Sequence, residues 1–212
     1  AALRRRLVAG SPEMIPYARP SIGDAEIAEV EACLRSGWLS TGPRAQRFER
    51  ELAASLGVKH ALGACSGTAA LHLAVLAAGI GPGDEVITTP LTWVATANVI
   101  LDVGATPVLV DIDPATRNID LDRLEAAITP KARAIVPVDL AGLPVDRDRL
   151  YAIANAHRLR VVEDAAQSFG ANWRGKAIGA SGDFVSFSFH ANKNLTTGEG
   201  GASVTANDQW AD

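Results

Sequence analysis

The sequence contains few cysteines, few aromatic residues and no long hydrophobic run, and each shortage excludes a class of protein. Cys33 and Cys65 are the only cysteines in 212 residues, which favours a reducing compartment over a disulfide framework. Aromatic residues make up 5% of the chain and no basic stripe accompanies them, so we expect no nucleic-acid surface. The longest apolar stretch, around 71–78, is too short for membrane insertion. We therefore expect a cytoplasmic protein.

The remaining composition is that of a globular protein. Hydrophobic residues make up 48% of the chain and charged residues 21%, with a net charge of -4, which suits one substantial core. The four histidines are scattered without metal-ligand spacing, so we expect no metal site. The single methionine is Met14, and we expect residues 1–13 to be a leader or an artificial remnant and residues 14–212 to form one domain.

Short runs of Val, Ile and Leu alternate with helical patterns along the chain. Strands are expected in the segment from Ala61 and at 85–88, 107–110, 134–138, 159–162, 184–189 and 201–205. Helices are expected at 24–36, around 48–56, after Ser66-Gly67 with Leu71, Val75 and Leu76 buried, and at 94–101, 121–128 and 145–157. This alternation predicts an α/β fold of three layers, in which helices flank a mainly parallel, seven-stranded sheet.

In such a sheet, ligands bind beyond the carboxyl ends of the strands, where this chain places several polar residues. Ser66, Gly67 and Thr68 lie at a helix start, where free backbone N–H groups favour a phosphate, although a plain helix cap has the same pattern. No G-x-G-x-x-G follows the first strand and no P-loop pattern occurs, which argues against a dinucleotide and against a P-loop nucleotide.

Three more strand ends carry candidate residues. Glu163 and Asp164 end an apolar strand and should point to opposite sides, so that one can be solvated while the other, if buried, needs a cationic partner. An ordinary structural salt bridge is the alternative. Trp93 lies near the end of another strand, where it can cover a flat ring or simply pack in the core. Lys193 follows the strand at 184–189 in a glycine-rich segment, whereas most lysines are solvated surface residues.

These features together match the requirements of pyridoxal 5'-phosphate (PLP). The chain offers, in this order, a phosphate cradle at Thr68, an aromatic face at Trp93, a carboxylate at Asp164 and an amine at Lys193. The aldehyde of PLP condenses with a lysine, and its pyridinium nitrogen needs an anion to stay protonated. The sequence therefore predicts a PLP site.

The motifs around these residues resemble those of the fold-type I PLP enzymes and, among them, the sugar aminotransferases of the DegT group. They are S-G-T-A-A-L at 66–71, G-D-E-V-I at 83–87, G-A-T-P at 104–107 with D-I-D at 111–113, E-D-A-A-Q at 163–167, and S-F-H-A-N-K-N at 188–194 with G-E-G-G at 198–201. The resemblance implies the large PLP-binding domain of the aspartate aminotransferase-like fold. The stretches at 90–98 and 189–194 look most like the enzyme that makes UDP-4-amino-4-deoxy-L-arabinose for lipid A modification.

The resemblance also implies a role for each candidate residue. Lys193 would bond the cofactor aldehyde and later move a proton between the substrate carbon and the cofactor, and Asp164 would pair with the pyridinium nitrogen. Trp93 would stack on the ring, and Gln167 would approach the side of the ring hydroxyl. The phosphate would be held by Gly67, Thr68 and Ser188.

The implied reaction moves an amino group from L-glutamate to a keto group of a nucleotide-linked sugar, of the UDP-4-keto-pentose type, in a homodimer. Lys193 argues against the dehydratase relatives, which carry histidine at this position. Two alternatives stay open: another fold-type I chemistry, such as a cyclitol aminotransferase or a PLP lyase, and a catalytically silent fragment. The family carries a further small C-terminal domain, which we expect to be absent here, so we expect weak or no turnover from these residues alone.

Overall fold

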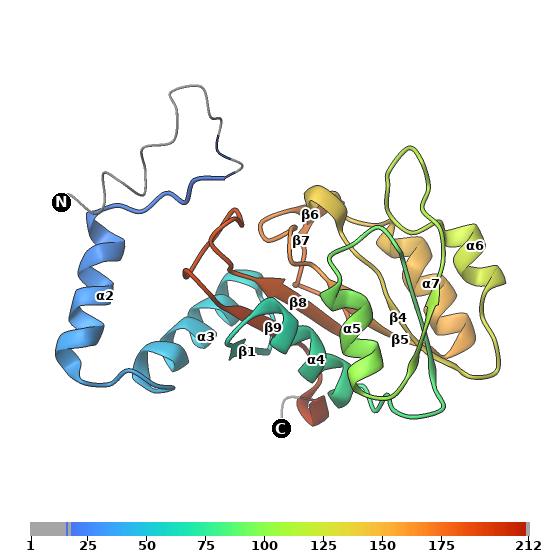
Figure 1. Ribbon diagram of the computed structural model, residues 1–212, viewed down its shortest axis with the longest axis horizontal. Coiled ribbons are helices and arrows are strands. Elements are labelled where there is room, and N and C mark those ends of the chain that lie inside the picture. The colour runs from blue at the N-terminus through green and yellow to red at the C-terminus, as the bar shows by residue number, and fades with distance from the viewer. Residues whose placement is uncertain (1–15, 17, 211–212) are drawn as a thin grey trace.

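The computed structural model describes residue 16 and residues 18–210 (Figure 1), so the expected leader at 1–13 lies outside the described residues. The helices are α2 (Asp24–Ser36), α3 (Pro43–Leu56), α4 (Gly67–Ala77), α5 (Ala95–Asp102), α6 (Leu121–Ala126) and α7 (Arg147–His157), with short 3-10 helices at Leu140–Gly142 and Asp208–Trp210. The strands are β1 (His60–Ala64), β2 (Glu85–Thr88), β3 (Thr106–Leu109), β4 (Ala132–Val136), β5 (Arg160–Asp164), β6 (Asn172–Trp173), β7 (Lys176–Ala177), β8 (Phe184–Ser188) and β9 (Gly201–Thr205).

Seven of these strands form one sheet in the order β1-β9-β8-β5-β4-β2-β3. All neighbours from β8 to β3 run parallel, whereas β9 runs antiparallel to both β1 and β8. The mainly parallel, seven-stranded sheet is therefore confirmed. The sequence pattern did not predict the separate hairpin of β6 and β7, because each of its strands is only two residues long.

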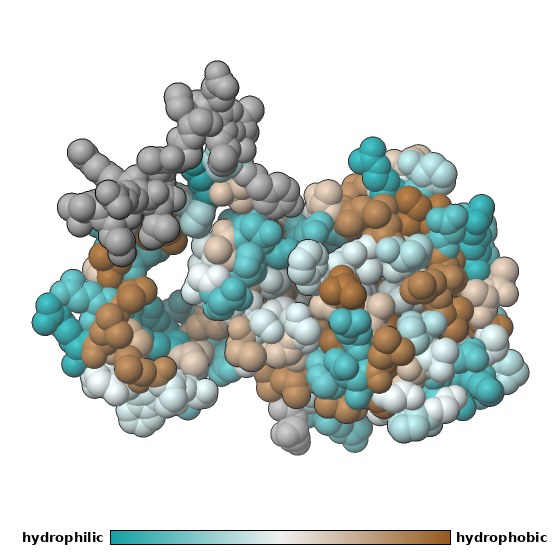
Figure 2. Space-filling view, viewed as in Figure 1, coloured by the Kyte–Doolittle hydropathy of each residue, from teal (hydrophilic) through white to brown (hydrophobic). Residues whose placement is uncertain are grey.

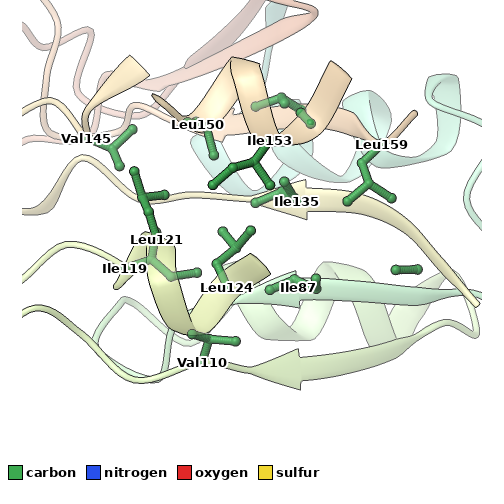
Figure 3. Packing of buried hydrophobic residues seen from close by; sticks show 13 residues of the cluster. Ile87, Val110, Ile119, Leu121, Leu124, Ile135, Val145, Leu150, Ile153 and Leu159 are labelled. Atoms are coloured by element: carbon green, nitrogen blue, oxygen red, sulfur yellow. The ribbon is translucent and has the colours of Figure 1, made fainter. Parts of the chain in front are cut away.

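Helices cover both faces of the sheet and bury its alternating side chains. On one face, α6 and α7 pack Leu124 and Leu150 against Ile87 and Ile135 of the sheet (Figure 3). On the other face, residues of α4 and α5 pack against the alternate positions of the same strands. Because neighbouring residues of a strand point to opposite faces, each central strand contributes to both clusters. This arrangement gives the expected three layers.

Two expectations about helix faces need correction. Leu76 of α4, expected to be buried, is 50% exposed, because α4 packs through Leu71 and Val75 instead. The apolar side chains of α2 recur at helical spacing, yet α2 has no buried residue. Helix α2 projects from the rest of the domain (Figure 1), and hydrophobic residues lie on the surface at this end of the molecule (Figure 2). Within residues 18–210, no helix is long and apolar enough to cross a membrane.

Candidate functional site

The topology gathers the predicted residues at the carboxyl edge of the sheet. Asp164 is the last residue of β5, and Lys193 follows β8, the neighbour of β5 in the sheet. The start of α4 lies against the end of β8, since a Cβ atom added to Gly67 would be 2.7 Å from the Cβ of Ser188. Segments more than 120 positions apart in the sequence, from Gly67 to Lys193, thus meet at one edge.

Asp164 is a buried carboxylate that accepts two hydrogen bonds but forms no ion pair within the described part of the chain. The hydroxyl of Thr96 donates to Oδ2 at 2.7 Å, and the backbone N–H of Ala166 donates to Oδ1 at 3.2 Å. Burial raises the pKa of Asp164, and this effect outweighs the lowering by the two hydrogen bonds and by the charge of Lys193. A cationic group beside Asp164 would therefore gain a strong electrostatic partner.

Glu163 points to the opposite face of the sheet, as expected, but it is not solvated. Its exposed fraction is 1%, because α7 covers this face. Arg147 forms an ion pair with Oε2, and the hydroxyl of Tyr151 donates to Oε1 at 2.7 Å. Burial raises the pKa of Tyr151 to about 12. The expectation that one of the two carboxylates could be solvated is thus wrong, and Glu163 is an internally paired structural group.

Lys193 is a half-buried lysine that follows β8 in a turn. Its backbone N–H donates to the carbonyl oxygen of His190 at 2.9 Å, which fixes the start of the turn. Burial lowers the pKa of Lys193, and the negative charge of Asp164 partly opposes this effect. In residues 18–210, the Lys193 ammonium group forms no ion pair. A partly desolvated amine without a fixed partner is suited to nucleophilic chemistry.

The start of α4 lies beside Ser188 at the carboxyl end of β8. The Ser66 hydroxyl caps the helix by accepting a hydrogen bond from the N–H of Ala69 at 3.1 Å. The N–H groups of Gly67 and Thr68 lie in the first turn, where helical geometry offers them no intrahelical acceptor. A Cβ atom at Gly67 would lie 2.7 Å from the Cβ of Ser188, so glycine at this position lets the start of α4 approach the end of β8 closely. These donors and the helix dipole suit a phosphate.

Trp93 and Gln167 flank this edge of the sheet. Trp93 directly precedes the first turn of α5 and is 76% exposed, which excludes the core-packing alternative. Gln167 is also exposed, and its Oε1 accepts a hydrogen bond from the backbone N–H of Ala141 at 2.6 Å. Both side chains are therefore available at the surface of the site, and the amide of Gln167 is held in one orientation.

Sequence comparison adds a family to this geometry. Residues 20–212 match the DegT/DnrJ/EryC1/StrS aminotransferase family. The chain belongs to this family. Its members are PLP-dependent aminotransferases, in agreement with the cofactor that the sequence predicts.

Three relatives show how far the similarity extends. Spore coat polysaccharide biosynthesis protein SpsC from Bacillus subtilis (strain 168) is 53% identical over 198 residues, which are 93% of this chain and 51% of SpsC. The PLP form of Spr1654 from Streptococcus pneumoniae is 42% identical, with a TM-score of 0.88 over 92% of this chain and 54% of Spr1654. DesI, solved in the presence of its TDP-sugar product, is 39% identical, with a TM-score of 0.87 over 96% of this chain and 52% of DesI. The chain spans about half the length of these relatives.

Sequence reasoning missed three buried polar residues near the site. The first is Thr96, for which the only signal was a second threonine, Thr92, four positions earlier at the expected helix start. No local pattern marks the other two, because their side-chain partners, Glu163 for Arg147 and Ser168 for Asp139, lie 16 and 29 positions away along the chain. The missed residues are Thr96, Arg147 and Asp139.

Asp139 is a third buried carboxylate near the end of β5, after Asp164 and Glu163. Its Oδ1 accepts a hydrogen bond from the N–H of Val145 at 2.9 Å, and its Oδ2 accepts one from the Ser168 hydroxyl at 2.7 Å. Its own N–H donates to the carbonyl oxygen of Asp164 at 3.1 Å. Burial raises the pKa of Asp139, and the negative charge of Asp164 adds to this rise. Asp139 therefore supports the backbone of Asp164 while its charge opposes that of the Asp164 side chain.

Proposed function

We propose that this chain binds PLP and carries the cofactor site of an aminotransferase that moves an amino group from L-glutamate to a keto group of a nucleotide-linked sugar. One observation carries the proposal: a half-buried amine and a buried carboxylate lie at the ends of adjacent strands. Lys193 follows β8, and Asp164, which has no cationic partner among the described residues, is the last residue of β5. When bound, PLP supplies an aldehyde that reacts with amines and a ring that withdraws electrons from the substrate carbon.

Lys193 and Asp164 have complementary roles in this proposal. Lys193 would bond the cofactor aldehyde through Nζ, and the same amine would move a proton to and from the substrate carbon. Because burial lowers its pKa, a larger fraction of Nζ is the neutral, nucleophilic amine than in an exposed lysine. Asp164 accepts the hydrogen bond of the protonated ring nitrogen and stabilises its positive charge.

The other predicted residues orient the cofactor in this proposal. The first-turn N–H groups of Gly67 and Thr68 and the hydroxyl of Ser188 hold the phosphate, and the absence of a side chain at Gly67 lets these groups lie close together. The exposed indole of Trp93 covers one ring face, and Gln167 lies toward the ring hydroxyl. These residues provide the phosphate cradle and the ring contacts, and Lys193 and Asp164 provide the chemistry.

A nucleotide-linked sugar is the substrate class that the relatives support. DesI was solved with its TDP-sugar product, and SpsC is described as a polysaccharide biosynthesis protein. The narrower expectation, a UDP-4-keto-pentose and lipid A modification, gains no support from the relatives compared above. We therefore keep the proposal at the level of a keto-sugar nucleotide and leave the sugar and the aminated carbon open to experiment.

The homodimer and the cytoplasmic location stay predictions. Exposed apolar side chains on α4 and α5 support a second copy of the chain as a partner, because large apolar surface of this kind is usually covered. They are Leu73, Leu76 and Leu101. Sedimentation of the purified chain should show a dimer, and a monomer at micromolar concentration would contradict this prediction.

The glutamate half-reaction tests the proposal without knowledge of the sugar. The PLP-loaded chain, incubated with L-glutamate alone, should release 2-oxoglutarate in proportion to bound PLP, and Lys193→Ala should release none. A panel of keto-sugar nucleotides can then identify the acceptor.

The alternative of a catalytically silent fragment makes a different prediction for the same experiment. Tight PLP binding without release of 2-oxoglutarate would support that alternative. Failure to bind PLP would contradict the proposal itself.

A further inference from the structure

Thr96 connects two residues that the proposed function assigns to the cofactor ring. It is fully buried in the first turn of α5, and its Oγ1 lies 2.7 Å from Oδ2 of Asp164 and 3.0 Å from the carbonyl oxygen of Trp93. The hydroxyl oxygen of Thr92 lies 2.7 Å from the same Oγ1. One side chain thus contacts the carboxylate and the backbone of the aromatic residue.

The number of available hydrogen atoms determines which group donates and which accepts in this cluster. The Thr96 hydroxyl has one hydrogen, whereas an ionised Asp164 and the Trp93 carbonyl can only accept. The charged acceptor forms the stronger and shorter bond, so Thr96 donates to Asp164. The Thr92 hydroxyl then donates to Oγ1 of Thr96, and the Trp93 carbonyl still receives the backbone N–H of Thr96 at 3.1 Å. Both side-chain hydroxyls of the cluster therefore donate in the direction of Asp164.

The surroundings of Asp164 make this donor important. The charged groups near the carboxylate are Lys193, whose charge lowers the pKa of Asp164, and Asp139, whose own pKa is raised by the charge of Asp164. Because Lys193 would bond the cofactor aldehyde, its charge would not be a permanent electrostatic partner of Asp164. Among the described residues, the hydroxyl of Thr96 is the side chain that donates a hydrogen bond to Asp164.

We propose that Thr96 is a positioning residue of the cofactor site, which keeps Asp164 ionised and in one rotamer for a cationic ring nitrogen. The same residue ties Asp164 to the backbone turn that carries Trp93, so it sets the carboxylate and the aromatic side chain relative to each other. This inference rests on the proposed function, because it assigns Thr96 to Asp164 as the partner of the ring nitrogen.

Two substitutions separate positioning from packing. Thr96→Val keeps the shape of the side chain but removes the hydroxyl, and Thr96→Ser keeps the hydroxyl but removes the methyl group. Because a hydrogen bond to a charged group contributes about 1.5–3 kcal/mol, Thr96→Val should weaken PLP binding by about tenfold to a hundredfold. Thr96→Ser should bind PLP within about threefold of the wild type, by the same reasoning.

The signature of the mechanism is the protonation of the ring nitrogen, read by NMR with PLP labelled with 15N in the ring. In the wild type and in Thr96→Ser, the signal should be that of a protonated nitrogen, and in Thr96→Val it should move toward the neutral form. Thr96→Ala replaces Thr96→Val if the valine variant does not fold by circular dichroism, with the same expectation. A purely packing role predicts the opposite ranking, with Thr96→Ser impaired and Thr96→Val near wild type, and that result would overturn the inference.

Asp164→Asn distinguishes failure of this inference from failure of the proposed function. If Asp164→Asn shifts the ring-nitrogen signal and Thr96→Val and Thr96→Ala do not, only the role of Thr96 is wrong. If Asp164→Asn leaves the signal and the PLP affinity unchanged, the assignment of Asp164 to the ring is wrong, and the role of Thr96 falls with it.

Discussion

Two neighbouring carboxylates on opposite faces of β5, Glu163 and Asp164, have different partners. On the α7 face, Glu163 is neutralised by Arg147 and hydrogen-bonded by Tyr151. On the α5 face, Asp164 receives only a hydroxyl and a backbone N–H, although it is also buried. A buried carboxylate costs free energy unless it is paired, so the unpaired one is the exception that needs an explanation. We explain Glu163 as a group that stabilises the fold and Asp164 as a group reserved for a cationic ligand.

The largest effect on stability is expected when the partner of Glu163 is removed. Arg147→Ala leaves a buried negative charge, so the free energy of unfolding should fall by about 3–5 kcal/mol, measured by urea denaturation. Replacing both partners, as Arg147→Met with Glu163→Leu, should recover most of this loss because no unpaired charge remains.

The matched control is Arg35→Ala, which removes an exposed ion pair with Glu31 on α2. Its unfolding midpoint should stay close to that of the wild type, because exposed ion pairs contribute little. If Arg147→Ala lowered the stability toward urea as little as Arg35→Ala, Glu163 would not be the structural member of the pair Glu163 and Asp164.

The second prediction concerns the other face of β5. Asp164→Asn removes the anion proposed for the ring nitrogen, so 2-oxoglutarate release from glutamate should slow by about a hundredfold or more, in line with the loss of one preorganised electrostatic group. Stopped-flow absorbance of the PLP-loaded chain measures this rate. Asp148→Asn, an exposed position on α7, is the control and should react at the wild-type rate. A wild-type rate in Asp164→Asn would remove Asp164 from the site.

The pH dependence of the stability of the cofactor-free chain tests the environment of Asp164 in a second way. The pKa of Asp164 is raised in the folded state, so between its ordinary value and its folded value the folded chain binds more protons than the unfolded chain. Its contribution to stability should therefore increase as the pH falls through the folded pKa toward the ordinary carboxyl pKa. As the pH falls across this range, the melting temperature should rise less for Asp164→Asn than for the wild type. Equal changes of the melting temperature with pH in both proteins would contradict a raised pKa of Asp164.

The smallest effect is expected where apolar residues are left uncovered. Leu34 of α2 is 61% exposed, so Leu34→Ala should change the free energy of unfolding by less than about 0.5 kcal/mol. Leu124 of α6 is fully buried, and Leu124→Ala should cost about 2–5 kcal/mol, because it leaves a cavity between α6 and the sheet. Equal losses in urea denaturation would show that α2 is packed in solution.

The sequence was sufficient to predict the sheet, most of the helices and the positions of Asp164 and Lys193, because strand and helix periodicity and residues at strand ends are local signals. It did not predict what covers each apolar face: α2 has the spacing of a packed helix, yet none of its residues is buried. It also missed Thr96 and Arg147. Thr96 lies 68 positions from its carboxylate partner, and only the folded topology brings the two together.

The most direct test of the account is to identify the lysine that bonds the cofactor. The chain is incubated with PLP, reduced with borohydride and digested, and the labelled peptide is identified by mass spectrometry. The account predicts a label on Lys193, in the segment after β8, and no specific label in Lys193→Ala. A stoichiometric label on an exposed lysine such as Lys176, with Lys193 unmodified, would contradict it.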